Sequence, residues 1–238
     1  MDTGHRKKAY LLLIPARGGS KSIPHKNIMP LKGQPLIYYT INAALEAKKI
    51  GVNGEVCVST DDEKIARVSR ELGANVPFMR PADISGDEAK SITFVLHAMD
   101  FFEKAGRCFD AVLILEPTSP LRTATDIAAA IDLYEKAGQP SLISVYQEEH
   151  LSERSFYRKK GNVGEALSTA HNSGQRRQDS EDLYVRNGAI FLTDVDYLKQ
   201  TGKIFSDTPA LYVMPKGRSL DINTREDAEY AEYLMGRG

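Results

Sequence analysis

A group of basic side chains follows the first apolar run of the chain. The segment "IPARGGSKSIPHKN", residues 14–27, carries Arg17, Lys21, His25 and Lys26 around two adjacent glycines. Glycine lets the backbone approach an anion closely, and backbone N–H groups, hydroxyls and lysines line phosphate cradles. The spacing matches neither G-x-x-x-x-G-K-[ST] nor G-x-G-x-x-G. The segment therefore predicts a polyphosphate site of another type, with a flexible basic loop as the alternative.

The charge balance of the whole chain restricts the kind of partner. The 238 residues include 31 Lys and Arg against 32 Asp and Glu, a formal net charge of −1. This balance gives no electrostatic reason to expect nucleic acid or an anionic membrane surface, so a small anion is the expected partner. Cys57 and Cys108 lie at no metal-ligand or redox spacing, and the first apolar run is too short for a signal peptide or a membrane span. We expect a cytoplasmic protein that binds neither nucleic acid nor membrane.

Alternating strand and helix patterns place the basic loop at the edge of a parallel sheet. Strands are predicted over residues 9–16, 54–60, 109–117 and 140–147, and helices over 35–50, 60–73, 91–106 and 123–138. Thr60 or Asp61 is the expected cap of the second of these helices. The alternation predicts an α/β fold with a doubly wound, mainly parallel, Rossmann-like sheet. Ligands of such sheets bind beyond the carboxyl ends of the strands, where the basic loop begins.

The alternation stops after Gln147. Residues 148–187 are polar, contain several glycines and alternate weakly, a pattern typical of an extended hairpin or arm that meets a partner subunit. Short strands return over residues 188–194 and 210–215, followed by a final helix over residues 223–235 that begins with Asn223 or Thr224 as its cap. We therefore expect a single domain, residues 1–238, from which residues 148–187 extend as a dimerisation arm.

Six motifs in the same order resemble one enzyme family. The segment at residues 14–27 is similar to the signature of the acylneuraminate cytidylyltransferases, with Ser22 in place of a glycine. The other matching segments are "VSTDDEKIA", "RPADISGDEAKS", "LEPTSPLR", "QRRQDSEDLYVRNGAIF" and "SLDINTREDAEYAE". The resemblance implies a fold of the nucleotide-diphospho-sugar transferase type. It also implies transfer of CMP from CTP to the anomeric hydroxyl of an acidic nine-carbon 2-keto-3-deoxy sugar, with release of pyrophosphate.

The resemblance assigns the basic loop to CTP. It implies that Arg17, Ser20, Lys21 and Asn27 hold the phosphates and ribose, with Lys26 nearby. Lys21 and Arg17 would be catalytic, because phosphoryl transfer is accelerated mainly by positioned positive charge.

The resemblance assigns Arg80 and Ser91 to the cytosine and ribose. An arginine has several donors for the O2 and N3 acceptors of cytosine. An ion pair of Arg80 with Asp83 or Asp87 is the alternative.

The segment "SLDINT" resembles a family motif in which two aspartates hold Mg²⁺. Asp221 matches the first ligand, and Asn223 replaces the second. Mg²⁺ prefers oxygen ligands, and an amide oxygen brings no charge, so metal affinity should be reduced. The alternative for Asn223 is a cap of the final helix.

The sugar side of the site is also implied by the resemblance. Arg177, Gln178 and Asn187 are candidates for contacts to the sugar acid, and Arg154 would add a cation, supplied by the partner of a homodimer. Glu116 stands where the family commonly has a glutamine in contact with the sugar. An acid at this position can repel a carboxylate or receive an amine or additional hydroxyls. Relatives of N-acetylneuraminate such as legionaminic or pseudaminic acid, or another nine-carbon acid, are therefore candidate acceptors.

Two other functions remain open from the sequence. One is a nucleotidyltransferase of the same fold that acts on a Kdo-type acid or a sugar phosphate. The other is a non-catalytic nucleotide-binding relative, which the substitutions at Glu116 and Asn223 suggest. The base preference and the dependence on a sugar carboxylate would distinguish the first alternative from the expected reaction. The absence of pyrophosphate release would distinguish the second.

Overall fold

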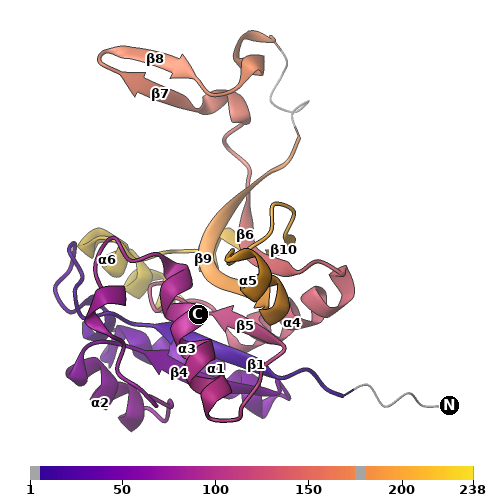
Figure 1. Cartoon of the computed structure of the whole chain (residues 1–238). Helices are drawn as coiled ribbons and strands as arrows, with labels where there is room; N and C mark the ends of the chain where they lie inside the picture. Colours follow the sequence, from indigo (N-terminus) through magenta and orange to yellow (C-terminus); the bar gives the residue numbers. More distant parts are fainter. Residues whose placement is uncertain (1–5, 175–180, 238) are drawn as a thin grey trace.

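A six-stranded sheet forms the centre of the computed structural model, which describes residues 6–174 and 181–237 (Figure 1). Its order is β10-β6-β9-β5-β1-β4, and β9 runs antiparallel to β5 and β6 while the other neighbouring pairs are parallel. The strands are β1 (Tyr10–Pro15), β4 (Gly54–Ser59), β5 (Ala111–Ile114), β6 (Ser141–Glu148), β9 (Leu183–Asp194) and β10 (Ala210–Val213). The predicted α/β fold with a mainly parallel sheet is confirmed.

Helices cover both faces of the sheet. On one face lie α1 (Leu36–Lys49), α2 (Glu63–Glu71) and α4 (Ala124–Ala137), and on the other lie α3 (Ser91–Lys104) and α5 (Val195–Thr201). In β1, Leu12 and Ile14 pack into the first layer whereas Leu11 and Leu13 pack into the second. A strand buried on both faces needs an unbroken apolar run, which is the pattern seen in the sequence. The short helix α5 was not predicted.

The last part of the chain returns to the loop that follows β1. This loop contains the 3₁₀ helix η1 (Lys26–Ile28) and a small ribbon of β2 (Pro30–Leu31) and β3 (Gln34–Pro35). The final helix α6 (Arg225–Met235) shares a small apolar cluster with this region, formed by Ile23, Leu31, Leu36, Ile222 and Ala231. Residues from the two ends of the sequence therefore lie together beside the sheet.

The helix caps differ in part from the predictions. Asp62 caps α2, because its carboxylate accepts the N–H groups of Lys64 and Ile65; the prediction of Thr60 or Asp61 was wrong. The hydroxyl of Thr60 instead accepts a hydrogen bond from the N–H of the capping residue Asp62, two positions further along the chain. Thr224 caps α6 in a reciprocal capping box, as one of the two predictions had it.

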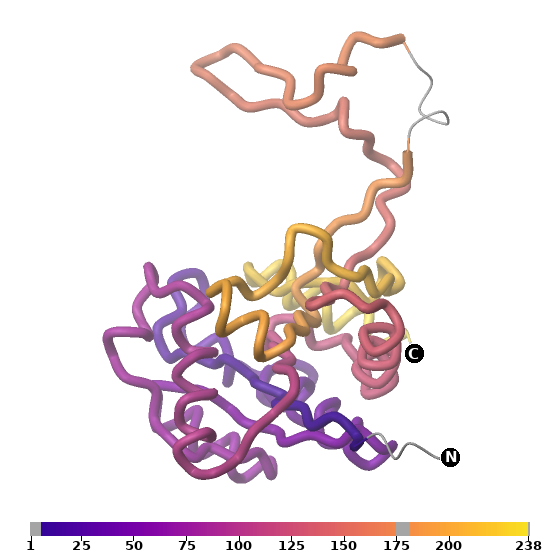
Figure 2. The backbone as a smooth tube through the Cα atoms, turned by 45° about the vertical axis from the view of Figure 1, so that its right-hand side comes forward, coloured from indigo at the N-terminus to yellow at the C-terminus, as the bar shows by residue number. Residues whose placement is uncertain are grey.

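An extended arm projects from the body of the molecule (Figures 1 and 2). It continues from the outer ends of β6 and β9 and carries the hairpin of β7 (Tyr157–Lys160) and β8 (Val163–Ala166). Short 3₁₀ helices flank the hairpin, namely η3 (Glu153–Ser155) and η4 (Thr169–Asn172); two others, η2 (Ala82–Ile84) and η6 (Lys216–Arg218), lie in the body. The predicted hairpin is present, and its role in dimerisation stays a prediction. Within the described ranges, none of the helices has the length and apolar character needed to cross a membrane.

A close approach to α2 fixes the start of the basic loop. The N–H of Gly18 donates to Asp61 Oδ1 at 2.9 Å, and the side-chain amide of Asn27 donates to the carbonyl of Arg17 at 3.0 Å. A Cβ atom on Gly18 would lie 2.7 Å from Asp62 Oδ2, whereas one on Gly19 would meet nothing within 4 Å. Glycine is therefore required at position 18 to clear the cap of α2, and position 19 has no such constraint.

We predict that Gly18→Ala destabilises the protein and Gly19→Ala does not. The added methyl group must displace Asp62, so the cap of α2 is lost and the unfolding free energy should fall by about 1–2 kcal/mol. Equilibrium unfolding in denaturant measures this difference. Equal stabilities of the two variants would contradict the contact between Gly18 and Asp62.

Candidate functional site

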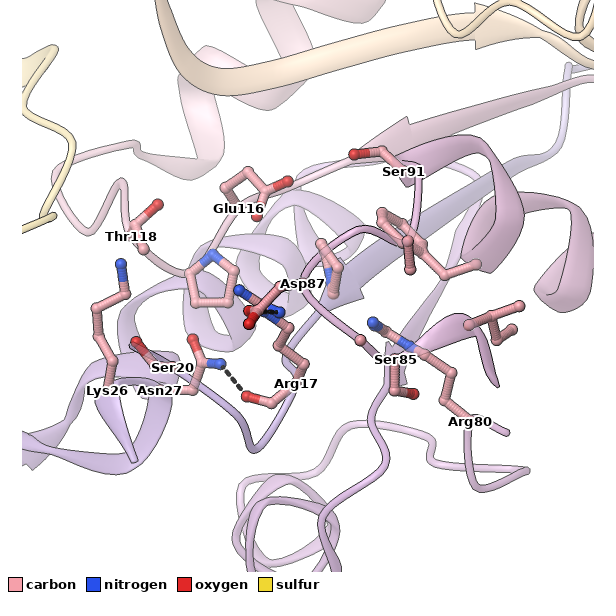
Figure 3. Close-up of a pocket in the computed structure, with 16 residues that line it drawn as sticks. Arg17, Ser20, Lys26, Asn27, Arg80, Ser85, Asp87, Ser91, Glu116 and Thr118 are labelled. Carbon is pink, nitrogen blue, oxygen red and sulfur yellow. Dashed lines mark hydrogen bonds and ion pairs between the residues drawn. The ribbon is translucent and has the colours of Figure 1, made fainter. Parts of the chain in front are cut away.

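A cavity of about 290 Å³ lies beyond the carboxyl ends of β1 and β5 (Figure 3). Three segments that are far apart in the sequence line it: the end of β1 with the basic loop, the region from Arg80 to Phe94, and the turn after β5. The residues predicted for the site that line this cavity are Arg17, Ser20, Asn27, Arg80, Ser91 and Glu116. The structure thus brings these six side chains together at the edge where parallel sheets bind ligands.

One carboxylate joins the two predicted catalytic cations. Arg17 Nη1 lies 2.6 Å from Asp87 Oδ1, and Lys21 Nζ lies 2.8 Å from Asp87 Oδ2. Hydrogen bonds from Lys21 and then from Arg17 hold the pKa of Asp87 below its usual value. Asp87 and Arg17 line the cavity, while Lys21 reaches Asp87 from outside it, with 78% of its side chain exposed. Two positive charges therefore meet at one anionic group.

Arg80 is buried beside the cavity and does not pair with Asp83 or Asp87. Its Nε donates to Ser59 Oγ at 3.0 Å and its Nη2 to the carbonyl of Ser59 at 2.6 Å. Its guanidinium lies 4.8 Å from the centre of the Phe94 ring. Burial lowers the pKa of Arg80 to about 10, so the side chain stays charged at neutral pH. The alternative of an ion pair with these aspartates is wrong, because Ser59 fixes the guanidinium against the end of β4.

Glu116 and Lys26 also line the cavity. Burial, and next the negative charge of Asp221, raise the pKa of Glu116 to about 7, although Arg122 and Lys26 oppose the shift. Burial lowers the pKa of Lys26, whose Nζ donates to the carbonyl of Ile222 at 2.9 Å. Glu116 can therefore change its protonation state near neutral pH.

Asp221 and Asn223 lie at the rim rather than in the lining. The N–H of Ile222 donates to the carbonyl of Thr118 at 2.8 Å, which ties this segment to the turn after β5. The side-chain amide of Asn223 donates to Asp221 Oδ2 at 2.9 Å, and both residues are exposed. Its amide oxygen and the other carboxylate oxygen are oxygen donors of the type that Mg²⁺ prefers. No group of three or more His, Cys, Asp or Glu side chains within the described residues is arranged to hold a metal ion.

The predicted sugar contacts have different positions. Asn187 is buried, and its side chain accepts from Ser144 Oγ and the N–H of Ala189 and donates to Ser219 Oγ and Met214 Sδ. A sugar contact through Asn187 would require one of these bonds to break. The structure does not bring Arg154 to the cavity: it lies in η3 of the arm, where its Nη1 donates to Ser173 Oγ at 3.4 Å.

Two further predicted residues, Arg177 and Gln178, lie outside the described residues. The sugar roles of all these residues stay predictions.

Sequence reasoning missed the parts played by Asp61 and Asp87. Asp61 holds the backbone of the basic loop, and Asp87 holds its two cations. The available signal was an acidic residue in a short glycine-containing loop that precedes a helix. Whether Asp87 pairs with the cations of the basic loop or with Arg80 depends on how the segments cross at the sheet edge. Spacing along the chain does not supply that information.

We predict that Glu116→Gln becomes more stabilising as pH rises. Because the folded protein holds a proton on Glu116 up to about pH 7 and the unfolded chain releases it near 4.5, wild-type stability falls across this window. Glutamine removes that loss, so the stability difference in favour of the variant should grow by about 1–3 kcal/mol from about pH 4 to about pH 8. Unfolding measured over this range checks the prediction, and a difference that stays constant contradicts it.

The chain is similar to enzymes that form CMP-activated sugar acids. It is 32% identical over 224 residues to the pseudaminic acid cytidylyltransferase of Campylobacter jejuni, covering 94% of this chain and 95% of that protein. It is 33% identical over 227 residues to the CMP-N,N'-diacetyllegionaminic acid synthase of Legionella pneumophila, covering 94% and 95%. It is 32% identical over 218 residues to the N-acylneuraminate cytidylyltransferase of Streptococcus agalactiae, covering 91% of this chain and 51% of that protein.

Comparison with solved structures agrees with the fold. The structure of CMP:2-keto-3-deoxy-manno-octonic acid synthetase complexed with CTP matches 97% of this chain and 99% of that chain, with a TM-score of 0.67 and 17% identity. At this identity the similarity concerns the fold alone. The family model described as cytidylyltransferase matches residues 11–234, and the chain therefore belongs to the cytidylyltransferase family.

Proposed function

We propose that this protein transfers CMP from CTP to the anomeric hydroxyl of an acidic nine-carbon 2-keto-3-deoxy sugar and releases pyrophosphate. The observation that carries the proposal is the cavity that Arg17 and Lys26 of the basic loop, the buried Arg80 and the acidic Glu116 line together. The class of acceptor is supported by relatives that match most of this chain and whose names give pseudaminic, legionaminic and N-acylneuraminic acids as their substrates or products.

The basic loop binds the phosphates in this proposal. Arg17 and Lys21 already hold an anion between them, the carboxylate of Asp87. During attack on the α-phosphorus, negative charge grows on the phosphate oxygens and the leaving pyrophosphate, and fixed cations stabilise that charge. Ser20 adds a hydroxyl donor, and Asn27 keeps the carbonyl of Arg17, and so the loop, in place.

Arg80 recognises the base in this proposal. The Nε and Nη2 groups of Arg80 donate to Ser59, and within the described part of the chain the Nη1 group of Arg80 has no hydrogen-bond partner. A planar guanidinium fixed in this way can donate to the O2 and N3 acceptors of cytosine. Ser91 lies at the start of α3 on the same side of the cavity and is placed to contact the ribose.

Magnesium fits the rim at Asp221. One carboxylate with a neighbouring amide oxygen is a sparse protein site, the kind Mg²⁺ uses when substrate phosphates and water complete its shell. A bound Mg²⁺ would neutralise phosphate charge. Asp221 would hold it, and Asn223 orients Asp221 through the 2.9 Å hydrogen bond to Oδ2.

Glu116 accepts the proton of the attacking hydroxyl. It is the carboxylate that lines the cavity next to Lys26, and a pKa of about 7 is close to the optimum for a general base at neutral pH. Lys26 adds positive charge near the acidic sugar.

CTP is a cytoplasmic metabolite and the exposed Cys108 is a free thiol, so we place the reaction in the cytoplasm.

The arm packs against a second copy of the chain in this proposal. A hairpin of two short strands is marginally stable alone, and here it projects from the body (Figure 1). The arm that carries this hairpin exposes large apolar side chains at Leu151, Phe156, Tyr157, Val163 and Leu167, between 42% and 71% exposed. An apolar surface of this kind on a projecting element is typical of a protein interface. A homodimer would cover the arm and carry Arg154 towards the partner's cavity.

The proposed reaction predicts pyrophosphate release that depends on both substrates and on Lys21. The assay supplies CTP, Mg²⁺ and one acid at a time from N-acetylneuraminic, pseudaminic, legionaminic and Kdo, with no-acid controls and with ATP, GTP and UTP in place of CTP. Release should require CTP and a nine-carbon acid. Lys21→Met should lower kcat by about 100-fold or more, because it removes a cation from the leaving group, while Lys49→Met on the far end of α1 should not.

The other results of this assay exclude the proposal. Release only with Kdo would identify a same-fold enzyme for an eight-carbon acid. Binding of CTP without release with any acid would identify a non-catalytic relative. Wild-type turnover by the Lys21→Met variant would remove the basic loop from the mechanism.

The dimer is tested separately from the reaction. We predict that the wild-type chain has twice its monomer mass in light scattering, and that a variant carrying Val163→Asp and Leu167→Asp has the monomer mass with unchanged thermal unfolding of the body. Charges at these exposed positions oppose burial against a partner but disturb no core contact. A monomeric wild-type protein would contradict the proposal.

A further inference from the structure

The carboxylate of Asp87 lies where an anionic substrate is expected. Its two oxygens contact different cations, Arg17 at 2.6 Å and Lys21 at 2.8 Å, in the way that two oxygens of a phosphate would. In Figure 3 Asp87 lies within the cavity, between Arg17 and Glu116. A polyphosphate cannot use these two cations fully while Asp87 remains bound to them.

The segment that carries Asp87 has room to leave. It is anchored before the acid, where the hydroxyl of Ser85 donates to the carbonyl of Pro81 at 2.8 Å, and after it, where α3 begins at Ser91. Between these anchors Asp87 and Glu88 are exposed, and a Cβ on Gly86 would meet nothing within 4 Å. The described part of the chain places no ion pair on Asp87 other than those to the basic loop.

We propose that Asp87 is an internal substitute for phosphate, which holds Arg17 and Lys21 together in the empty site and is displaced when a polyphosphate binds. The inference rests on the proposed role of these two cations in phosphate binding. In the empty site Asp87 offsets the repulsion between the cations and limits their motion. On binding, phosphate oxygens take over both contacts, and the loop around Gly86 is released next to Arg80 and Ser91.

The exchange has a cost that a neutral side chain would remove. Binding of a polyphosphate to the wild-type protein includes the loss of two ion pairs that are partly exposed to solvent. Pairs of this kind are weak, so the cost is a modest factor in affinity. Asp87→Asn keeps the size of the side chain and removes its charge. Glu88→Gln removes the same charge from the next position, which does not line the cavity.

The test measures binding by titration calorimetry with three probes, inorganic pyrophosphate, CTP and cytidine, for the wild-type protein and both variants. Asp87→Asn should bind pyrophosphate and CTP about three- to tenfold more tightly than wild type. Cytidine carries no phosphate, so its affinity should not change. Glu88→Gln should match wild type for all three probes.

Several results would overturn the inference. Equal or weaker pyrophosphate binding by Asp87→Asn would mean that the carboxylate does not compete with the anion. The same gain in Glu88→Gln would reduce the effect to general loop charge, and a gain for cytidine would place the change at the base. Because pyrophosphate needs no base recognition, its binding is independent of whether CTP and a sugar acid react. Thermal unfolding of each variant verifies that the comparison concerns folded protein.

Discussion

The repulsion between Arg17 and Lys21 is the constraint on which the site depends. Two cations held close together need an anion, and they need a loop that stays in place without one. Asp61 and Asn27 fix the backbone of that loop, and Asp87 supplies the anion. The sheet contributes by placing the ends of β1, β4 and β5 side by side, so that the segments following them meet.

The cavity combines charges in two different environments. Arg17, Lys21 and Asp87 are partly exposed, so their ion pairs are weak and exchangeable. Glu116 is partly buried, and burial there raises its pKa to about 7. An exchangeable end suits a substrate that must enter and a product that must leave. A partly buried carboxylate with a raised pKa suits a group that moves a proton.

Much of the fold was predictable from the sequence because the signals are local. The apolar run of β1 and the alternation of strands and helices each report on a single element and its burial. The motifs also singled out Arg17, Arg80 and Glu116, which line one cavity, while their roles stay predictions. Contacts between segments were not predictable: Asp87 meets the basic loop instead of Arg80, and Asp62 rather than Asp61 caps α2. The partner of Asp87 depends on how the loops cross in three dimensions, and the identity of the cap depends on a shift of one residue in where α2 begins.

If CTP binds in the cavity beyond β1 and β5, it protects the segments that line this cavity. Hydrogen–deuterium exchange of the whole chain, measured with and without CTP, reports that protection. CTP should slow exchange in the basic loop, residues 16–27, and in residues 80–91, with little change at the opposite end of the sheet around residues 50–55. Slowed exchange confined to that opposite end, with none in the two loops, would mean that CTP does not bind in this cavity.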